Sequence, residues 1–493
     1  MNTAILIPVL LVLAPLIPAV VSAFLSGHAG WRNGVNIGFA ALKLALVTYA
    51  LAGVAAGAEY EWRIAFVPGL DLVLRLDALA LLFVTLSAVL WVATTLYAIA
   101  YLKGTPHQAR FFAFFNLCVV AASGIAMSGS LITFFVFYEI LTLATWPLVV
   151  HTGSAKAMAA GRTYLAYTLA GSAALLAGIV WLESGSGPVE FADGADLSGF
   201  STLSASVIFA LLIGGLGAKT ALIPLHPWLP AAMAAPAPVS ALLHAVAVVK
   251  AGAFGVVRVI YDVYGIETVA ALGLGIPLAA LASATIIYGS LQALCQSDIK
   301  KRLAYSTVSQ VSYIVLGASL AGPFAVIGGL VHLVHQGLMK ITLFFGAGVL
   351  AERAGITGIA QMDGIGRRMP ITMAAFSVAA LGMIGVPPVA GFVSKWYLAL
   401  GGYQSGASWV VGVLIASSLL NAAYFLPMLY RAWLKPSADT LPSRETLAST
   451  RTWLLILPGA FTAMAALGAG LFAGFELSPL GWATLIVERI YLP

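Results

Sequence analysis

Charged side chains are scarce in this sequence of 493 residues, of which only 9% are charged and 61% are hydrophobic. A soluble domain of this length could not hydrate its surface with so few charges, so we expect lipid to be the main solvent. Because a membrane-spanning helix needs ~20 apolar residues, the chain has room for roughly a dozen or more spans in one membrane domain.

Cysteine is also scarce, and dense clusters of basic residues are missing. Cys118 and Cys295 are too few and too far apart to predict a disulfide framework or a four-thiolate metal site. The net charge of +6 comes from Lys and Arg residues scattered through short loops. Such a distribution forms no basic face for a nucleic acid, and we expect no nucleic-acid partner.

Fourteen apolar runs predict fourteen transmembrane helices. The first run lacks a basic segment before it and is too long for a signal peptide, so we interpret it as a span. The runs cover residues 3–25, 36–57, 76–101, 111–129, 131–150, 162–183, 205–225, 238–261, 268–294, 303–321, 324–351, 371–402, 408–433 and 452–475.

The positions of the 24 Lys and Arg residues predict the orientation of these helices. Fifteen lie in the loops after odd-numbered spans or at the span ends facing them, and four face the even-numbered loops. The positive-inside rule therefore places the odd loops in the cytoplasm and both termini on the opposite side. The fifteen are Arg32, Lys103, Arg110, Lys156, Arg162, Lys300, Lys301, Arg302, Arg353, Arg367, Arg368, Arg431, Lys435, Arg444 and Arg451.

The remaining five basic residues are lysines inside apolar runs: Lys43, Lys219, Lys250, Lys340 and Lys395. A charge at the middle of a bilayer costs ~3 kcal/mol or more, so each is a candidate functional residue. Lys43 is only about two turns into its run, and we expect its side chain to reach the membrane interface. The other four predict a pathway for protons or small cations.

Glu139 and Lys219 form the first candidate site. Glu139 is the only carboxylate between His107 and Glu183, and Lys219 precedes Pro224, which is expected to break the helix. Transporters place ion sites at such breaks. The two residues could form a static ion pair, but we favour a switch in which proton occupancy of one member affects the other.

His244 and Lys250 are candidate relay residues on the next predicted helix. Six residues of continuous helix would separate them by roughly 120° around the axis and about 9 Å along it. They could then act in succession without touching.

Three polar residues, His332, Gln336 and Lys340, recur at intervals of four and would share one helix face. A lone buried histidine is usually a satisfied core residue, but an aligned stripe favours a hydrated path. His332 and His335 could also bind zinc. We consider this weaker, because no Cys or carboxylate lies nearby in sequence to complete the ligand set.

Lys395 follows a second break, at Pro387 and Pro388. Its similarity to the Lys219 segment suggests an internal repeat with ion sites at the breaks.

These segments resemble the antiporter-like subunits shared by respiratory complex I, membrane-bound hydrogenases and Mrp-type cation/proton antiporters. The similarity covers most of residues 76–433. It is carried by the helix with Glu139 and by residues 219–232, 235–244, 297–310 and 385–395.

The resemblance implies an all-α fold of about fourteen transmembrane helices with two inverted five-helix repeats and Pro-broken helices. The repeats would be residues 111–261 and 268–433, between three N-terminal spans in residues 1–110 and a C-terminal helix and tail in residues 452–493. The family's ion-path positions correspond to Glu139, Lys219, Lys250 and Lys395, with His244, His332, His335 and Lys340 as candidate relays.

The same resemblance implies other membrane subunits as partners, no cofactor in this subunit, and a multi-pass location in the bacterial plasma membrane. Within the family, the length and the His-rich stretch before Lys340 favour the Mrp D-type subunit of a Na⁺/H⁺ antiporter. The alternative is the proton-pumping membrane subunit of a complex I-like oxidoreductase or a hydrogenase. Gln336, where many members have histidine, and the segment 240–250 depart from the D-type pattern.

Overall fold

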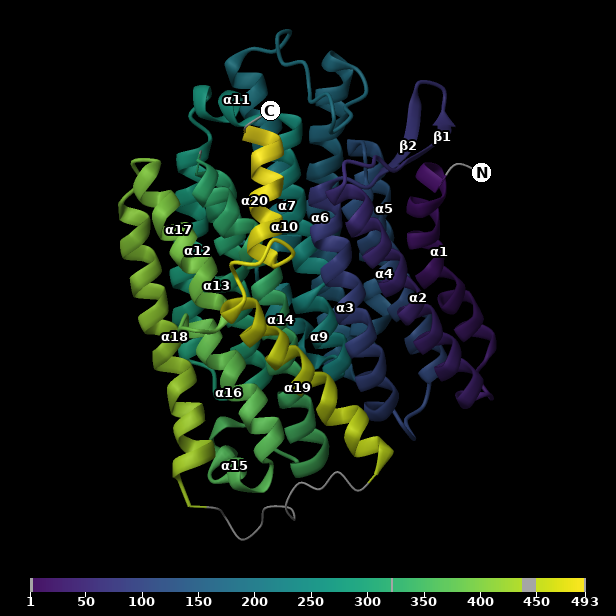
Figure 1. Cartoon of the computed structure of the whole chain (residues 1–493), viewed down its shortest axis with the longest axis vertical. Coiled ribbons are helices and arrows are strands. Elements are labelled where there is room, and N and C mark those ends of the chain that lie inside the picture. Colours follow the sequence, from purple (N-terminus) through teal and green to yellow (C-terminus); the bar gives the residue numbers. More distant parts are fainter. Residues whose placement is uncertain (1–2, 321, 437–448, 492–493) are drawn as a thin grey trace. The chain divides into compact units, whose positions relative to one another are not determined.

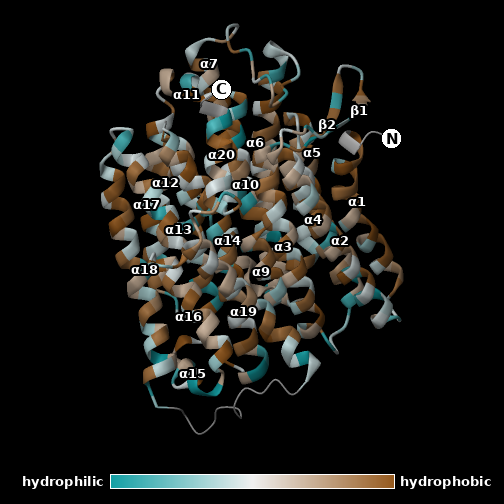
Figure 2. Ribbon diagram, viewed as in Figure 1, coloured by the Kyte–Doolittle hydropathy of each residue, from teal (hydrophilic) through white to brown (hydrophobic). Residues whose placement is uncertain are grey.

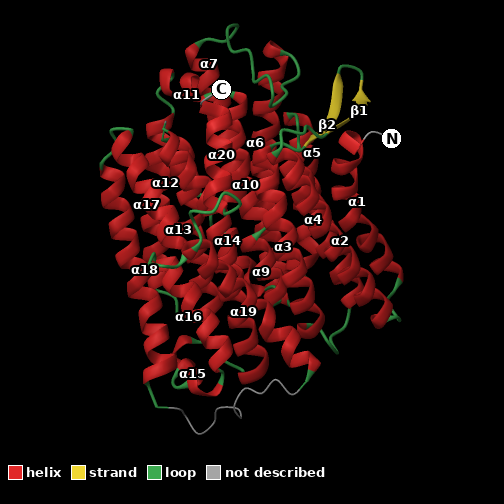
Figure 3. Cartoon of the chain, in the orientation of Figure 1, coloured by secondary structure: helices red, strands yellow, loops and turns green. Residues whose placement is uncertain are grey.

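The structure is a computed structural model that describes residues 3–320, 322–436 and 449–491 (Figure 1). In these residues the regular elements are helices apart from β1 and β2, as Figure 3 shows. The predicted orientation also relies on Arg444 and on the two termini, Met1 and Pro493. These residues lie outside the described residues. The predicted all-α polytopic class is confirmed.

The described residues fold into two compact units. The first comprises Met1–Val92, Pro106–Ala234 and Val246–Ala280 as far as they are described. Helices α3 (Ala78–Tyr101) and α12 (Gly275–Leu294) contribute residues to both units. The other elements of the first unit are α1 (Thr3–Phe24), α2 (Ala29–Ala55), β1 (Glu61–Val67), β2 (Leu70–Arg75), α4 (Gln108–Met127), α5 (Leu131–Val149), α6 (Ala155–Ser186), α7 (Thr202–Thr220), α8 (Trp228–Ala231), η1 (Ala232–Ala234), α10 (Val248–Arg258), η2 (Val259–Val263) and α11 (Ile266–Ala271).

The second unit comprises Ala93–Thr105, Ala235–Ala245 and the described part of Leu281–Pro493. Its central helix is α14 (Pro323–Ala354), against which α9, α13, α16, α17, α19 and α20 pack. The elements are α9 (Ala237–Ala245), α13 (Ile299–Ser319), α14, η3 (Ile359–Met362), α15 (Ile365–Arg368), α16 (Pro370–Ile384), α17 (Ala390–Gln404), α18 (Trp409–Leu434), α19 (Thr450–Leu471) and α20 (Pro479–Tyr491).

Each of the fourteen predicted apolar runs contains a helix. Among the described residues, twelve helices are long and apolar enough to cross a membrane, and Figure 2 shows hydrophobic residues along most of their length. The other two predicted spans are α13 and the pair α16 and α17. Helix α13 is more polar because it begins with Lys300, Lys301 and Arg302, but most of its residues are buried by protein.

Hydroxyl side chains define where several of the helices begin. Ser130, Ser154 and Ser201 precede α5, α6 and α7, and each accepts a hydrogen bond from the main-chain NH three residues later. These bonds satisfy donors that a helix leaves unpaired at its first turn.

Two predicted helix breaks are confirmed. Helix α7 ends at Thr220, where Ala221 has a left-handed backbone with φ of 62°, and α8 begins only at Trp228. Helix α16 ends at Ile384 before Gly385 with φ of 97°, and α17 begins at Ala390. In both places the helix stops ahead of the prolines, as expected for residues that cannot donate a main-chain hydrogen bond.

A third break was not predicted. The run 238–261 is divided into α9 and α10, because Val246 and Ala247 leave the helical conformation. The expected separation of 120° between His244 and Lys250 is therefore wrong, since it assumed one continuous helix. Neither valine nor alanine is a helix breaker, so the local sequence contains no signal for this interruption.

The predicted interfacial position of Lys43 is also wrong. The side chain has 0% exposure, and its ammonium group donates hydrogen bonds to Ser87 of α3 and Ser123 of α4. Distance along the helix suggested that Lys43 could reach the membrane surface, but α3 and α4 enclose it.

We predict that Gly252→Ala destabilises the first unit. A Cβ atom at Gly252 would lie 2.6 Å from the main-chain nitrogen of Thr220 and 2.8 Å from the carbonyl oxygen of Leu216, so α10 would be pushed away from α7. Overpacking of this kind costs ~1–3 kcal/mol, which should lower the thermal unfolding temperature of the purified protein in detergent.

The matched control is Gly38→Ala, because a Cβ atom at this helical glycine meets nothing within 4 Å. The control should unfold at or slightly above the wild-type temperature. Equal unfolding temperatures for the two variants would contradict the close approach of α7 and α10.

Candidate ion pathway

Lys219 lies in the last turn of α7, directly before the break, and is fully buried. Its ammonium group donates a hydrogen bond to the main-chain carbonyl of Tyr138 and lies 3.2 Å from the centroid of the Tyr138 ring. The hydroxyl of Tyr138 donates to the carbonyl of Gly215 at 3.1 Å, which holds α5 against α7. The lysine is therefore solvated by a carbonyl oxygen and an aromatic face.

Glu139 is adjacent to this lysine in space but is held by another partner. Its carboxylate accepts a hydrogen bond from Ser172 of α6, and the side chain is half-buried. In the described residues, Glu139 and Lys219 form no direct ion pair. The static pair that the sequence allowed is thus not present in this arrangement, although the two charges belong to one site.

Lys250 is the third charged residue of the first unit's predicted pathway. It is fully buried in α10, two residues before Gly252, where α10 approaches α7 closely. The sequence identified this lysine, but its position depends on the break before α10 rather than on a helix shared with His244.

The predicted polar stripe on α14 is fully buried, since His332, Gln336 and Lys340 all have 0% exposure. His332 Nδ1 is 2.8 Å from the hydroxyl of Ser394 on α17. Lys340 donates to the carbonyl of Leu303 at 3.1 Å and to the hydroxyl of Ser306, both on α13. The stripe thus connects α14 with two neighbouring helices of the same unit.

Two further histidines lie among these residues. His244 of α9 packs against Phe344 of α14, with ring centroids 4.6 Å apart, and its ring nitrogens have no hydrogen-bond partner among the described side and main chains. His335 is also fully buried in α14. Buried imidazole and amide groups are normally hydrogen-bonded, so an unpartnered ring in this region is suited to a hydrated passage.

Lys395 lies on α17 and binds the end of the preceding helix. Its ammonium group donates to the carbonyls of Met383 and Ile384 at 3.0 and 2.8 Å, and to the hydroxyl of Ser418 at 3.0 Å. Helix C-termini have unpaired carbonyls with partial negative charge, which favours a cation here. The break in the span therefore forms the binding site of the lysine.

The neutral partners of the predicted pathway residues are not evident from the sequence. Ser172, Ser306, Ser394 and Ser418 each contact one of the predicted residues. Serine is common in packed membrane helices, so its presence alone gives no signal of function. Only the spatial positions distinguish these hydroxyls from other serines.

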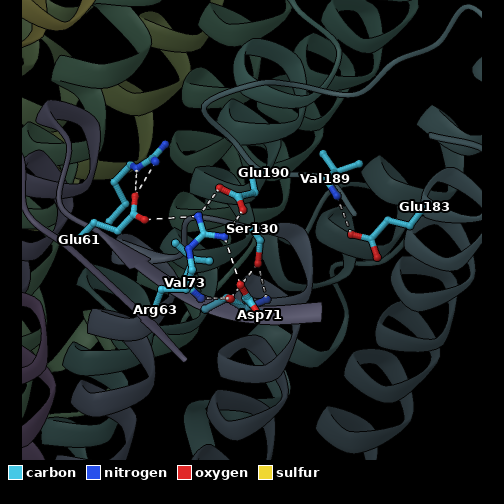
Figure 4. Close-up of polar contacts among 10 residues, drawn as sticks. Glu61, Arg63, Asp71, Val73, Ser130, Glu183, Val189 and Glu190 are labelled. Atoms are coloured by element: carbon cyan, nitrogen blue, oxygen red, sulfur yellow. Dashed lines mark hydrogen bonds and ion pairs between the residues drawn. The ribbon is translucent and has the colours of Figure 1, made fainter. Parts of the chain in front are cut away.

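A charged network outside the membrane-spanning segments stabilises the start of α5. Arg63 of the β1–β2 hairpin contacts both oxygens of Glu190, at 2.6 and 2.9 Å, and Asp71 at 3.3 Å (Figure 4). Its hydrogen bond with Glu190 raises the pKa of the Arg63 guanidinium above its ordinary value. The Gly129 main-chain NH also donates to the carbonyl of Val73 in β2. The hairpin thereby fixes the first turn of the helix that carries Glu139.

A second ion network lies at the end of α10. Arg258 is only 4% exposed and binds Asp77 at 2.8 Å and Asp262 at 2.6 Å. These contacts connect α10 to the segment that precedes α3.

Comparison with known proteins identifies the family of the chain. A family model described as "NADH:quinone oxidoreductase/Mrp antiporter, TM" matches residues 128–421. The chain is 37% identical to NADH-quinone oxidoreductase subunit N of Desulforudis audaxviator, with 92% of each chain covered. The chain belongs to this family. All eight predicted pathway residues lie inside the matched segment.

Two other proteins are similar over almost the whole chain. The D subunit of a Na(+)/H(+) antiporter from Bacillus subtilis is 27% identical, with 90% of both chains covered. A chain of the Mrp complex from Dietzia sp. is 23% identical, with a TM-score of 0.85 over 98% of this chain and 97% of that chain, and so shares the fold. The resemblance predicted from the sequence is confirmed, and the protein is an antiporter-like polytopic membrane subunit.

We predict that Arg258→Met destabilises the first unit more than Arg63→Ala does. Removing Arg258 leaves Asp262 without its buried counter-charge, which costs ~3–5 kcal/mol in comparable buried pairs. Arg63 is 40% exposed, and exposed pairs contribute ~1 kcal/mol or less. Thermal unfolding of both variants in detergent measures the difference, and a larger loss for Arg63→Ala would contradict the assignment of Arg258 as the structural cation.

Proposed function

We propose that the chain is a proton-translocating membrane subunit, and that its buried lysines carry the protons. The observation that carries this proposal is the chemistry of their partners: Lys219, Lys340 and Lys395 are held by carbonyl and hydroxyl oxygens. These neutral oxygens accept hydrogen bonds from an ammonium group and also from a neutral amine. A lysine held in this way can therefore lose and regain a proton without leaving an unpaired buried carboxylate.

Glu139 controls the protonation of Lys219 at the first site. A negative charge beside Lys219 favours the protonated lysine, and protonation of Glu139 removes that preference. Ser172 binds the carboxylate of Glu139, which forms no direct ion pair with Lys219 among the described residues. This arrangement supports the switch rather than the static pair.

The second unit offers a relay toward Lys395. His332 contacts Ser394, the residue directly before Lys395, and Lys340 lies two helical turns farther along α14. His335 and the unpartnered amide of Gln336 lie between them on the same helix. Imidazole can both accept and donate a proton near neutral pH, so the row of residues suits stepwise transfer.

The parent complex is proposed from the relatives. The subunit N relative, similar over nearly the full length of both chains, favours a redox-driven proton pump of the quinone oxidoreductase type. The Bacillus subtilis antiporter relative supports the Na⁺/H⁺ antiporter that the sequence favoured, at lower identity. In either complex the chain assembles with other membrane subunits, and it lies in a bacterial plasma membrane with both termini on the non-cytoplasmic side.

We predict that Lys395→Ala and Glu139→Ala each abolish most ion-coupled transport while the complex still assembles. Each substitution removes a group that holds the proton at one site, and loss of a positioned acid or base costs about tenfold or more. The measurement is proton movement into proteoliposomes that contain the purified complex, with assembly followed by native electrophoresis.

Lys156→Ala is the control, because this exposed lysine lies at the start of α6 outside the pathway. It should transport at the wild-type rate. Full transport by both pathway variants would refute the proposed role of the lysine and glutamate sites.

The composition of the purified complex distinguishes the two parent complexes. Iron–sulphur or flavin subunits, together with proton release that is independent of sodium, are expected for the redox-driven pump. Small multi-span subunits alone, together with sodium-dependent proton release from proteoliposomes, would instead establish the antiporter.

A further inference from the structure

Lys43 is a buried lysine that the proposed pathway does not use. It lies in α2, outside the segment matched by the family model, and its ammonium group is 2.6 Å from the hydroxyl of Ser123 and 3.4 Å from that of Ser87. The ring of Trp91 lies on another side, with its centroid 5.6 Å away. The surroundings are the same in kind as those of Lys219 and Lys395: neutral oxygens and an aromatic face.

In the part of the chain that the structure describes, the helices around Lys43 contain no carboxylate to balance this charge. Helices α1, α2, α3 and α4 contain no Asp or Glu. On α4 the charged and titratable residues are Arg110 and Cys118, on α2 they are Arg32 and Tyr49, and α1 and the part of α3 in this unit have none. Arg110 binds the carbonyl of His151, and Cys118 contacts Thr145 of α5.

A column of polar side chains runs from Trp91, beside Lys43, to the beginning of α2. Trp91 donates to Asn116 at 3.1 Å, and Asn116 donates to Asn36 at 2.6 Å. At the end of the column, Arg32 donates to Gln108 at 2.6 Å. Asn36 bridges the two parts, because its amide donates to the carbonyl of Arg32 at 2.7 Å.

This column ends near the face that the distribution of basic residues assigns to the cytoplasm. Arg32 and Gln108 lie at the first turns of α2 and α4, and Arg32 belongs to the set of fifteen residues on that face. Buried amides and a lysine without a counter-charge are costly in a membrane helix bundle, and apolar residues would pack the same helices without that cost.

Helix α4 also connects Lys43 with the first pathway site. Ser123 of α4 accepts the hydrogen bond from Lys43, and Cys118 of the same helix contacts Thr145 of α5, the helix whose Tyr138 binds Lys219. Helix α4 thus contacts both Lys43 and α5, the helix that binds Lys219.

We propose that Lys43 is an additional proton-binding site, loaded from the predicted cytoplasmic face along the column formed by Arg32, Asn36 and Asn116. The inference rests on the proposed transport function. The ammonium group releases one proton to water at that face and becomes a neutral amine, which still donates hydrogen bonds to Ser123 and Ser87. Uptake of a proton reverses the step, and no other bond changes.

The test uses Lys43→Gln, Lys43→Met and Lys43→Arg in the complete complex reconstituted in proteoliposomes. Glutamine keeps hydrogen-bond donors for Ser123 and Ser87 but binds no proton at working pH. Arginine keeps the donors and the charge but does not release its proton. We expect all three variants to transport protons about tenfold more slowly than wild type, with an altered dependence of rate on pH.

A purely structural lysine gives a different result. In that case Lys43→Gln and Lys43→Arg restore transport and only Lys43→Met reduces it, together with the yield of assembled complex, and the inference is overturned. Wild-type rates in all three variants overturn it as well.

Lys395→Ala, measured in the same preparation, separates this inference from the proposed function. If Lys395→Ala loses transport while the Lys43 variants keep it, only the role of Lys43 fails. If Lys395→Ala transports normally, the proposed function itself fails.

Discussion

A positive charge in the hydrocarbon core of a membrane must be surrounded by oxygen atoms or aromatic faces, since water is excluded and the unpaired charge costs ~3 kcal/mol or more. Continuous helices supply few such oxygens, because their carbonyls are already paired within the helix. At Lys395 the chain obtains them by interrupting a helix. The carbonyls of Met383 and Ile384 are free to bind Lys395 because α16 ends there, and Lys219 occupies the last turn of α7 before its own break.

The two lysines beside the breaks have similar partners, but only Lys395 takes its carbonyls from an interrupted helix, because Tyr138 lies inside α5. Lys219 is held by a carbonyl and faces the ring of Tyr138, and Lys395 is held by carbonyls with the ring of Tyr313 5.6 Å away. Such a recurrence is expected of an internal repeat. The repeats at residues 111–261 and 268–433 remain a prediction.

The sequence predicts the features that proline, charge and hydrophobicity determine. Each of the fourteen hydrophobic runs contains a helix, and Pro224 and Pro387 located two interruptions, because proline acts on its own helix regardless of the fold. The break at Val246 and Ala247 escaped prediction, since neither residue type interrupts a helix by itself. Lys43 was misplaced because burial depends on α3 and α4, and the partner of Glu139 could not be read from spacing because Ser172 belongs to a different helix.

The charge of the partner separates structural cations from those suited to carry protons. Arg258 is almost fully buried between Asp77 and Asp262, and a guanidinium held by carboxylates stays charged and fixed. The buried lysines of α14 and α17 have neutral partners, so either protonation state can be accommodated in the same site. Lys219 lies between these cases: its direct partner is neutral, while Glu139 is one residue beyond Tyr138. In the proposed switch, that intermediate position makes the first site sensitive to a change of charge, and Lys43, with neutral partners only, fits the proposed class of proton-exchanging lysines.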